Sequence, residues 1–291
     1  MHPMDPAGQI QLAPDDAAQP WSKNLLSVCV EALGLVQKRS GLALTGPLRV
    51  LTRADERQLR QYLGADIAHV VAVAIPARRE IVIVRAALFA QSPEEQLQTL
   101  VHEMTHLVIA QNIPGRLPAW LEEGLCMIFA NQQGLGFTWR LTVAGSLGGV
   151  LPIEELEKTL LIGGDLQSLA YAQSLSMTQF LVRRTLAEEG RGGDSPAEFM
   201  RLLADPAEGP RMLGAMANRN WAASLDRQWR GEHRSVWNWI AILTGSSVLW
   251  VITTLLFLVA WWRKRRMSEL AREKMDDDED PVYSEDEFDE R

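Results

Sequence analysis

A stretch of 27 residues near the C-terminus, Val236 to Trp262, contains no Asp, Glu, Lys or Arg. As a helix that rises about 1.5 Å per residue, it exceeds the roughly 30 Å hydrocarbon thickness of a bilayer. Tryptophans lie near both of its ends, where indole rings prefer the headgroup region. A buried core helix is the alternative, but one of this length without a polar face would be unusual. The stretch therefore predicts one transmembrane helix, residues 236–262.

The flanks of this stretch bear on its orientation. Four basic residues follow it at 263–266, and the positive-inside rule puts that end in the cytoplasm, although Arg227, Arg230 and Arg234 precede the stretch and weaken the asymmetry. The preceding domain is then expected on the periplasmic side. Residues 1–20 contain no apolar segment that could serve as a signal peptide. A removed signal, or a cytoplasmic domain, would resolve this conflict.

Charge is distributed unevenly along the chain. The formal net charge is -8, and 12 of the 37 acidic residues follow Trp262. Residues 263–291 therefore form a basic and then acidic segment, which is too polar to fold and is predicted to be a disordered tail. The remainder is close to neutral and shows no cluster of Lys and Arg, which argues against a nucleic-acid partner.

The part before the apolar stretch predicts an α+β domain over residues 21–232. Residues 1–20 have a turn-rich composition and are expected to be a flexible lead. A small mixed sheet should come first, with a hairpin of two β-branched runs joined by Pro-Ala-Arg-Arg, and helices should follow to the end of the domain. The early elements are expected at residues 21–38 (helix), 48–51 (strand), 55–63 (helix), 69–75 (strand) and 80–84 (strand).

The best defined helix in the sequence begins after Ser92. Ser92 is a typical N-cap, Pro93 fits the first helical position, and Glu95 completes a capping box. The apolar pattern then continues to about Gln111. We therefore expect a helix of about 20 residues there, largely buried.

This helix contains the motif His102-Glu103-Met104-Thr105-His106. Four-residue spacing brings the two imidazoles onto one helix face, where together they can bind one zinc ion. Glu103 projects about 100° further round the helix, within reach of a water activated by the metal. Two satisfied core histidines are the alternative, but a carboxylate in so apolar a helix then lacks a partner. The motif predicts His102 and His106 as metal ligands and Glu103 as general base.

Catalytic zinc usually has three protein ligands, so a third must come from elsewhere. After a break at Asn112-Ile113-Pro114-Gly115, a second helix is expected to begin near Pro118. A short connection makes the two helices neighbours. Glu122 and Glu123 point about 100° apart on the second helix, so only one of them is expected to reach the metal.

The motif followed by Trp120-Leu121-Glu122-Glu123-Gly124-Leu125 resembles the peptidase MA, or gluzincin, superfamily. The resemblance extends more loosely over residues 20–230 and implies a zincin-like fold. It implies Glu123 as the third zinc ligand and Glu122 as a solvated or supporting carboxylate, with Gly124 allowing the two helices to pack closely. It also implies Tyr171 as stabiliser of the oxyanion, for which ordinary helix packing is the alternative.

Two further expectations follow from this resemblance. Met127 stands where thermolysin-like members have an aspartate that orients a zinc-bound histidine, so that role must be filled elsewhere. The strand Ile81 to Val84 is expected to be the sheet edge that binds extended substrate.

Cys29 and Cys126 either pair as a disulfide or remain buried free thiols.

Together these features predict a membrane-anchored metallopeptidase with one Zn²⁺ ion, a peptide or protein substrate and an attachment to the lipid bilayer through residues 236–262. The alternative from another class is an anchored scaffold that binds zinc without turnover. Zinc hydrolysis of a bond other than a peptide bond is a second alternative, because fold and metal do not fix the substrate. An intramembrane protease is disfavoured, because the motif lies about 130 residues before the apolar stretch.

Overall fold

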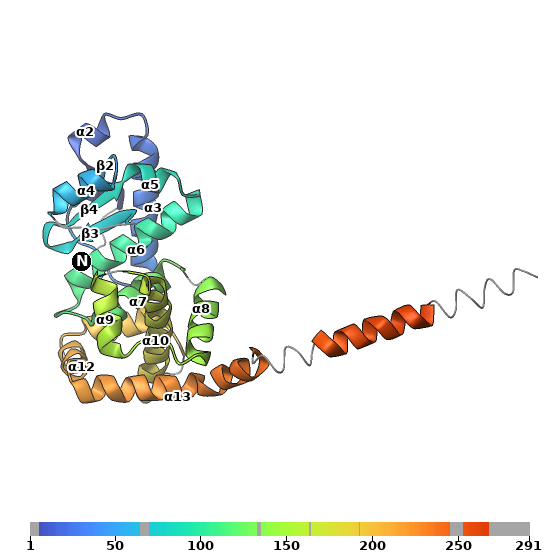
Figure 1. Cartoon of the computed structure of the whole chain (residues 1–291). Coiled ribbons are helices and arrows are strands. Elements are labelled where there is room, and N and C mark those ends of the chain that lie inside the picture. The colour runs from blue at the N-terminus through green and yellow to red at the C-terminus, as the bar shows by residue number, and fades with distance from the viewer. Residues whose placement is uncertain are drawn as a thin grey trace, which may run out of the picture. The chain divides into compact units, whose positions relative to one another are not determined.

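The structure, a computed structural model, describes residues 6–64, 70–132, 135–162, 164–191, 193–244 and 253–267. Contacts between residues divide the chain into two compact units, Met1–Ser235 and Val236–Arg291. The first unit has a mixed α+β fold, with a small four-stranded sheet followed by a mostly helical remainder (Figure 1). The predicted fold class is confirmed at this level.

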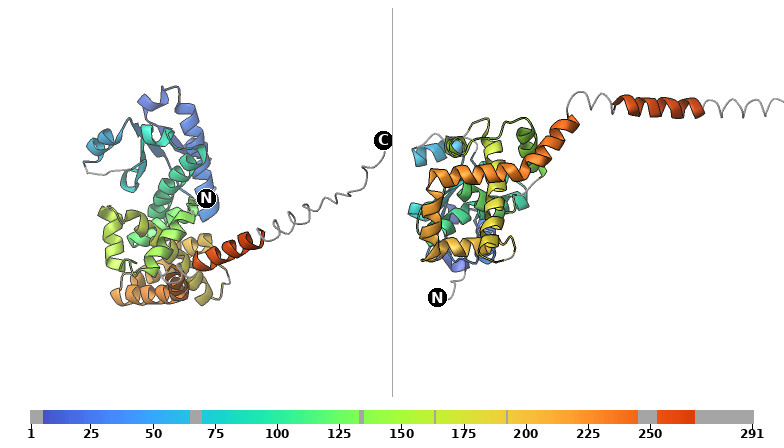
Figure 2. Two further views of the ribbon diagram at one scale, coloured as in Figure 1. Left: turned by 45° about the vertical axis from the view of Figure 1, so that its right-hand side comes forward. Right: turned by 90° about the horizontal axis from the view of Figure 1, so that it is seen from below.

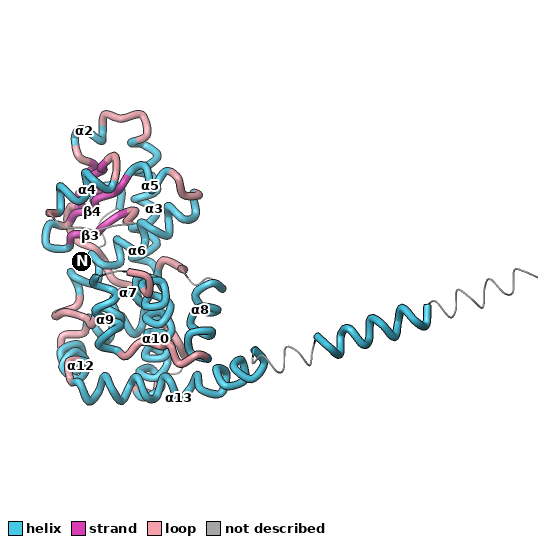
Figure 3. Tube along the Cα trace, viewed as in Figure 1, coloured by secondary structure: helices cyan, strands magenta, loops and turns pink. Residues whose placement is uncertain are grey.

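The sheet is mixed, as the sequence predicts, and its strand order is β1-β2-β4-β3. Strand β1 (Ile10–Leu12) pairs in parallel with β2 (Leu48–Arg53), and β2 pairs in parallel with β4 (Glu80–Val84). Strand β3 (Ala72–Ile75) pairs antiparallel with β4 across the short 3₁₀ helix η1 (Pro76–Arg78), which confirms the predicted hairpin (Figure 3). The edge strand of this hairpin is β3, so the expectation that Ile81 to Val84 forms the edge is wrong.

Residues 6–20 form part of the fold, which corrects the predicted flexible lead. They contain the short helices α1 (Pro6–Gln9) and α2 (Pro14–Ala17) as well as strand β1. The buried Asp16 carboxylate accepts hydrogen bonds from the backbone N–H and the hydroxyl of Thr52, each at 2.7 Å. Strand β1 has only three residues and its partners are distant in sequence, so no periodic pattern in residues 1–20 could predict it.

We expect Asp16→Ala to lower the free energy of unfolding by about 2–3 kcal/mol, because two buried donors on Thr52 lose their acceptor. Urea unfolding of the variant and of the unaltered chain measures this difference. The control is Asp15→Ala, since Asp15 is adjacent and exposed. Equal stability of the two variants would show that the Asp16 contacts contribute nothing.

The two faces of the sheet carry different helices. Helices α3 (Ser22–Ser40) and α6 (Pro93–Asn112) cover one face, where Val50, Ile81 and Ile83 enter the main core. Helix α4 (Glu56–Leu63) covers the other face, where Val82 and Val84 pack with its residue Leu59. The alternation along β4 fills both cores, as expected of a strand buried on both sides. The short helix α5 (Arg85–Phe89) leads from β4 toward α6.

The helical half follows α6 and surrounds a long helix, α10 (Figure 2). Helix α10 packs closely on α7, where the nearest residues to Gly124 are Ser174 and Thr178. The close approach that Gly124 allows is therefore toward α10 rather than toward the preceding helix. The bounds are α7 (Ala119–Phe129), α8 (Leu135–Ser146), α9 (Ile153–Ile162), α10 (Gln167–Glu188), α11 (Pro196–Ala204), α12 (Glu208–Met216) and α13 (Arg219–Thr244).

The predicted transmembrane helix falls partly outside the described residues, at positions 245–252. Positions 253–267 are helical and exposed. Among the helices that the structure describes, none is both long and apolar enough to cross a bilayer. Residues 263–267 of the predicted disordered tail are helical, which corrects the prediction there, and residues 268–291 lie outside the described residues. Cys29 and Cys126, both buried, are free thiols, which decides between the two alternatives left by the sequence.

Candidate metal centre

Helix α6 begins as the sequence predicts, and its residues His102, Glu103 and His106 lie on the side that faces away from the main core. The Ser92 hydroxyl accepts from the Glu95 N–H, and the Glu95 carboxylate accepts from the Ser92 N–H, which completes the capping box. Apolar residues anchor one face of the helix in the main core, among them Leu100, Met104 and Val108. This anchoring leaves the other face, with both histidines and Glu103, to line a cavity.

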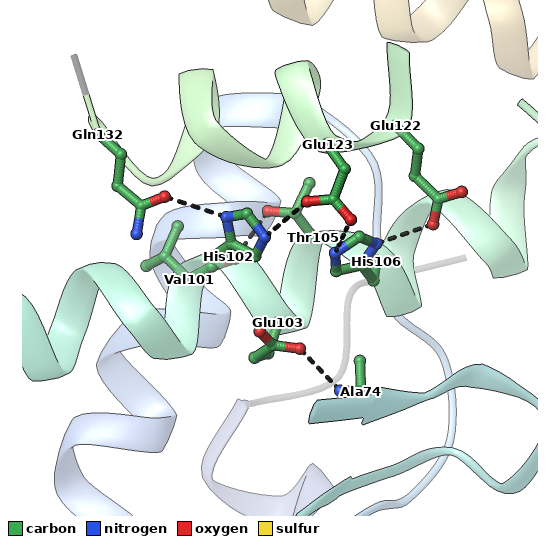
Figure 4. A network of polar contacts seen from close by, with 9 residues as sticks. All are labelled: Ala74, Val101, His102, Glu103, Thr105, His106, Glu122, Glu123 and Gln132. Atoms are coloured by element: carbon green, nitrogen blue, oxygen red, sulfur yellow. Dashed lines mark hydrogen bonds and ion pairs between the residues drawn. The ribbon is translucent and has the colours of Figure 1, made fainter. Parts of the chain in front are cut away.

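Helix α7 begins after Pro118 and brings a carboxylate between the two imidazoles (Figure 4). Glu123 Oε2 lies 3.3 Å from His102 Nε2, and Glu123 Oε1 lies 3.8 Å from His106 Nε2. The two imidazole ring centres are 5.2 Å apart. The structure thus places His102, His106 and Glu123 together, as the motif and the family resemblance predict.

The opposite nitrogen of each imidazole has its own partner. His106 Nδ1 lies 2.8 Å from Glu122 Oε1, and His102 Nδ1 lies 3.1 Å from Gln132 Oε1. A carboxylate or an amide oxygen only accepts, so these contacts favour a proton on each Nδ1. The lone pair of each Nε2 then faces Glu123, as metal-binding histidines require.

When both imidazoles are neutral, three electron-pair donors therefore lie close together. Glu123 Oε2 is buried and has no hydrogen-bond partner in the described part of the chain. Zinc that binds imidazole nitrogen and carboxylate oxygen at about 2.0–2.2 Å in tetrahedral geometry separates the two donors by about 3.4 Å. The observed separations of 3.3 and 3.8 Å fit that requirement. These residues are therefore suited to a zinc ion.

Cys126 is a second candidate for the third donor, because its sulfur and donor atoms of His102 and His106 all lie within 4.8 Å of one another. Burial raises the pKa of the Cys126 thiol to about 12, so this thiol would have to lose its proton to bind a metal. Cys126 also does not line the cavity, whereas Glu123 does. The sequence analysis missed this neighbour, although its position three residues after Glu123 on a helix places it on the same side.

Burial and nearby charges shift the pKa values of this site in opposite directions. Burial lowers the pKa of the His106 imidazole, but contacts with the Cys126 thiol and with the Glu122 and Glu123 carboxylates raise it well above its ordinary value. Burial raises the pKa of Glu103, although the two nearby imidazoles oppose this effect. A carboxyl group with a raised pKa beside a candidate metal site has the properties of a general base.

Glu103 lies at the edge of the sheet. Its Oε2 accepts a hydrogen bond of 2.7 Å from the backbone N–H of Ala74 in β3. Pairing alternates along an antiparallel strand, so Ala72 and Ala74 both direct their backbone groups away from β4. The edge of β3 therefore runs beside the candidate metal ligands.

A cavity of about 890 Å³ adjoins these groups, and residues of β3, α6, α7, α8 and α10 line it. Tyr171 lines it from α10, as predicted for a residue near the metal, and burial raises the pKa of its phenol. Met127 also lines the cavity but contacts neither imidazole through a hydrogen bond. The polar partner of the His102 ring is instead Gln132, a residue that the sequence did not point to.

The fold and the site define a metallopeptidase-like α+β domain. The sequence model of the peptidase MA superfamily matches residues 29–190, which is more than half of the chain. The chain therefore belongs to the peptidase MA superfamily, and this membership indicates a peptidase-type enzyme. The match ends at residue 190, so residues 191–230 of the looser resemblance lie outside it. Neither the curated proteins nor the solved structures contain a match.

Proposed function

We propose that the chain is a zinc-dependent metallopeptidase of the gluzincin type, anchored in a membrane. The observation that carries the proposal is the position of the Glu123 carboxylate, 3.3 Å from His102 Nε2 and 3.8 Å from His106 Nε2. Glu103 lies in the same cavity and accepts a hydrogen bond from the edge strand β3. Membership of a superfamily that is typically metal-dependent supports the same function.

His102, His106 and Glu123 would hold the zinc ion, while Glu122 and Gln132 fix the orientation of the two imidazoles. When bound, zinc supplies a Lewis acid that polarises a carbonyl group and acidifies water. Glu103 takes the proton from the attacking water and delivers it to the leaving amine. The peptide substrate aligns along β3 by hydrogen bonds to the backbone of Ala72 and to the carbonyl of Ala74, since the Ala74 N–H is bound to Glu103.

Tyr171 is proposed to donate a hydrogen bond to the oxyanion of the tetrahedral intermediate. Its phenol lies in the same cavity as the three donors, and the burial that raises its pKa keeps its proton in place at neutral pH. A protonated phenol is the form that can stabilise developing negative charge.

The test of this function is metal-dependent cleavage by the full chain. We expect about one zinc per chain by elemental analysis, and hydrolysis of an unstructured protein that a chelator abolishes and added zinc restores. A sample chelated and refilled with magnesium is the control, because magnesium prefers oxygen ligands. Bound zinc without turnover would favour the scaffold, and no bound zinc would exclude the proposed centre.

The identity of the third ligand gives a separate prediction. Loss of a residue that only supports a metal ligand usually weakens metal binding by about 10–100-fold. Glu123→Ala removes a proposed ligand itself, so we expect it to weaken zinc binding by more than this. Cys126→Ala is expected to leave zinc affinity within about twofold, because Cys126 does not line the cavity, whereas Glu123 does. Competition with a chromophoric chelator measures both affinities. The opposite ranking would assign the third position to Cys126.

Membrane anchoring is proposed for the C-terminal unit. The helical residues 253–267 leave large apolar side chains exposed, Phe257 among them at 71%. The guanidinium groups of Arg265 and Arg266 stack on Trp261 and Trp262, as suits the interface between hydrocarbon and headgroups. We propose that the peptidase domain lies on the periplasmic side.

Fractionation tests this attachment. The full chain is expected to stay with membranes during alkaline extraction, and a chain that ends at Ser235 is expected to be released. Release of the full chain would exclude a spanning anchor. Protease added to spheroplasts, whose outer membrane has been opened, then distinguishes a periplasmic from a cytoplasmic domain.

A further inference from the structure

A second, smaller cavity of about 310 Å³ lies beside the one that contains the proposed zinc ligands. Its walls are mainly apolar, with Pro76 and Ala77 on one side and Leu107 and Ala110 of α6 on another. Its polar lining consists of the side chains of Arg79 and Gln111. A single cation beside apolar walls is suited to a short acidic side chain with an aliphatic stem.

The position of Arg79 is fixed by its backbone. Arg79 has φ 54°, in the left-handed region that residues other than glycine seldom occupy. Its N–H donates to the carbonyl of Pro76, and its own carbonyl accepts from the N–H of Arg49 on β2. Strained backbone of this kind persists where the surroundings determine it, and it is frequent at binding sites.

Among the described residues, the guanidinium of Arg79 contacts Gly46 and Gln111 but no carboxylate. It packs on Gly46, where a Cβ atom would lie 3.1 Å from Nη1, and Nη2 lies 3.5 Å from Gln111 Oε1. In the part of the chain that the structure describes, no carboxylate lies within 4.0 Å of it, whereas Arg49 pairs with Glu80 at 2.6 Å. The charge of Arg79 is therefore available to a ligand.

The two cavities follow one track along α6 and the sheet edge. Pro76 lines both of them. Along α6, Glu103 and His106 line the first cavity, and Leu107, Ala110 and Gln111 line the second. The two sets are about 6–8 Å apart at 1.5 Å per residue. An extended peptide advances about 3.3 Å per residue, so two or three residues from the scissile bond reach Arg79.

The direction of the peptide follows from the edge strand. Strand β3 runs from the first cavity toward Pro76 and Arg79, and antiparallel pairing is slightly more stable per residue than parallel pairing. A peptide antiparallel to β3 places its amino side toward Arg79. We propose that Arg79 and the second cavity form a subsite for an aspartate or glutamate side chain two or three residues on the amino side of the scissile bond.

This inference rests on the proposed function for its cleavage point, but binding tests it independently. The probes are sets of fluorescent peptides. Within a set the peptides differ only by Glu, Gln or Lys at one position, and the sets place that position on either side of the cleaved bond. Their Kd is measured with the zinc-loaded Glu103→Gln chain, and kcat/KM is measured with the chain that retains Glu103. Arg79→Asn removes the charge and tolerates the left-handed backbone, while Arg78→Asn is the control, since Arg78 is exposed and does not line the cavity.

We expect the Glu peptide to be favoured over the Lys peptide by about tenfold in Kd and in kcat/KM, as for one partly exposed ion pair and one avoided repulsion. Arg79→Asn should reduce this ratio to about one, Arg79→Glu should invert it, and Arg78→Asn should preserve it. Thermal unfolding of each variant verifies folding.

Three outcomes would overturn the subsite. They are a ratio that Arg79→Asn leaves unchanged, no charge preference at any position, and a preference confined to the carboxyl side of the cleaved bond. If no peptide is cleaved but the Kd ratio is present and depends on Arg79, the proposed catalytic function fails while the subsite is supported.

Discussion

Replacing Glu103 by glutamine is expected to lower kcat/KM for peptide hydrolysis by about 10²–10⁴-fold, the usual contribution of a general base, with zinc content unchanged. Glutamine has the size of glutamate, and its amide oxygen can still accept from the Ala74 N–H. It cannot accept a proton from water at neutral pH. The variant therefore separates proton transfer from zinc binding and from folding.

The measurement combines steady-state cleavage of a fluorogenic peptide with zinc content and thermal unfolding. Glu31→Gln is a matched control, because Glu31 is exposed on α3 and distant in sequence from the motif. A Glu103→Gln chain that keeps more than a tenth of the activity would show that another group takes the proton.

The candidate site was predictable from sequence where one helix determines the geometry. His102, Glu103 and His106 lie within five consecutive residues, and the capping box at Ser92 fixes the start of their helix. The choice of Glu123 over Glu122 required the family resemblance, because helical spacing alone places either one near the imidazoles. In the structure both carboxylates contact imidazole nitrogens. Glu123 lies beside His102 Nε2, and Glu122 lies beside His106 Nδ1.

The supporting residue Gln132 was not predictable in this way. It follows the end of α7, where Asn131 adopts a left-handed conformation (φ 57°) and the N–H of Gln132 bonds back to the carbonyl of Met127. That turn directs the amide toward His102. The sequence shows that an aspartate is missing at Met127, but it does not show which distant side chain replaces it.

The fold shows the same division between local and long-range signals. The hairpin of β3 and β4 joins neighbouring segments, and its β-branched runs predict it. The parallel pairs of β1 with β2 and of β2 with β4 join segments separated by about 30 residues or more. Since those pairs decide that β4 is internal, the sequence could not identify β3 as the edge strand.

Gly124→Ala is expected to destabilise the chain by about 3 kcal/mol or more, because added volume in a tightly packed contact forces the backbone apart. A Cβ at this position would lie 2.1 Å from Thr178 Oγ1 and 2.7 Å from the Ser174 carbonyl oxygen. The hydroxyl can rotate, but the carbonyl belongs to the backbone of α10. Helix α7 must therefore move away from α10.

Gly34→Ala is the matched control, since Gly34 is also helical and a Cβ there meets no atom within 4 Å. It should stabilise the chain by about 0.5–1 kcal/mol, the usual gain for alanine in a helix. Urea unfolding of both variants measures the contrast. Equal stability of the two would mean that α7 and α10 are further apart than the structure shows.

The same substitution should also weaken zinc binding in the chains that remain folded. Glu123 immediately precedes Gly124, so a shift of α7 away from α10 displaces the carboxylate that faces both imidazoles. Zinc affinity measured below the unfolding temperature should fall for Gly124→Ala and stay unchanged for Gly34→Ala. If Gly124→Ala lowers stability but not zinc affinity, the α7–α10 contact is independent of the metal centre. If it lowers both, this contact positions the third ligand.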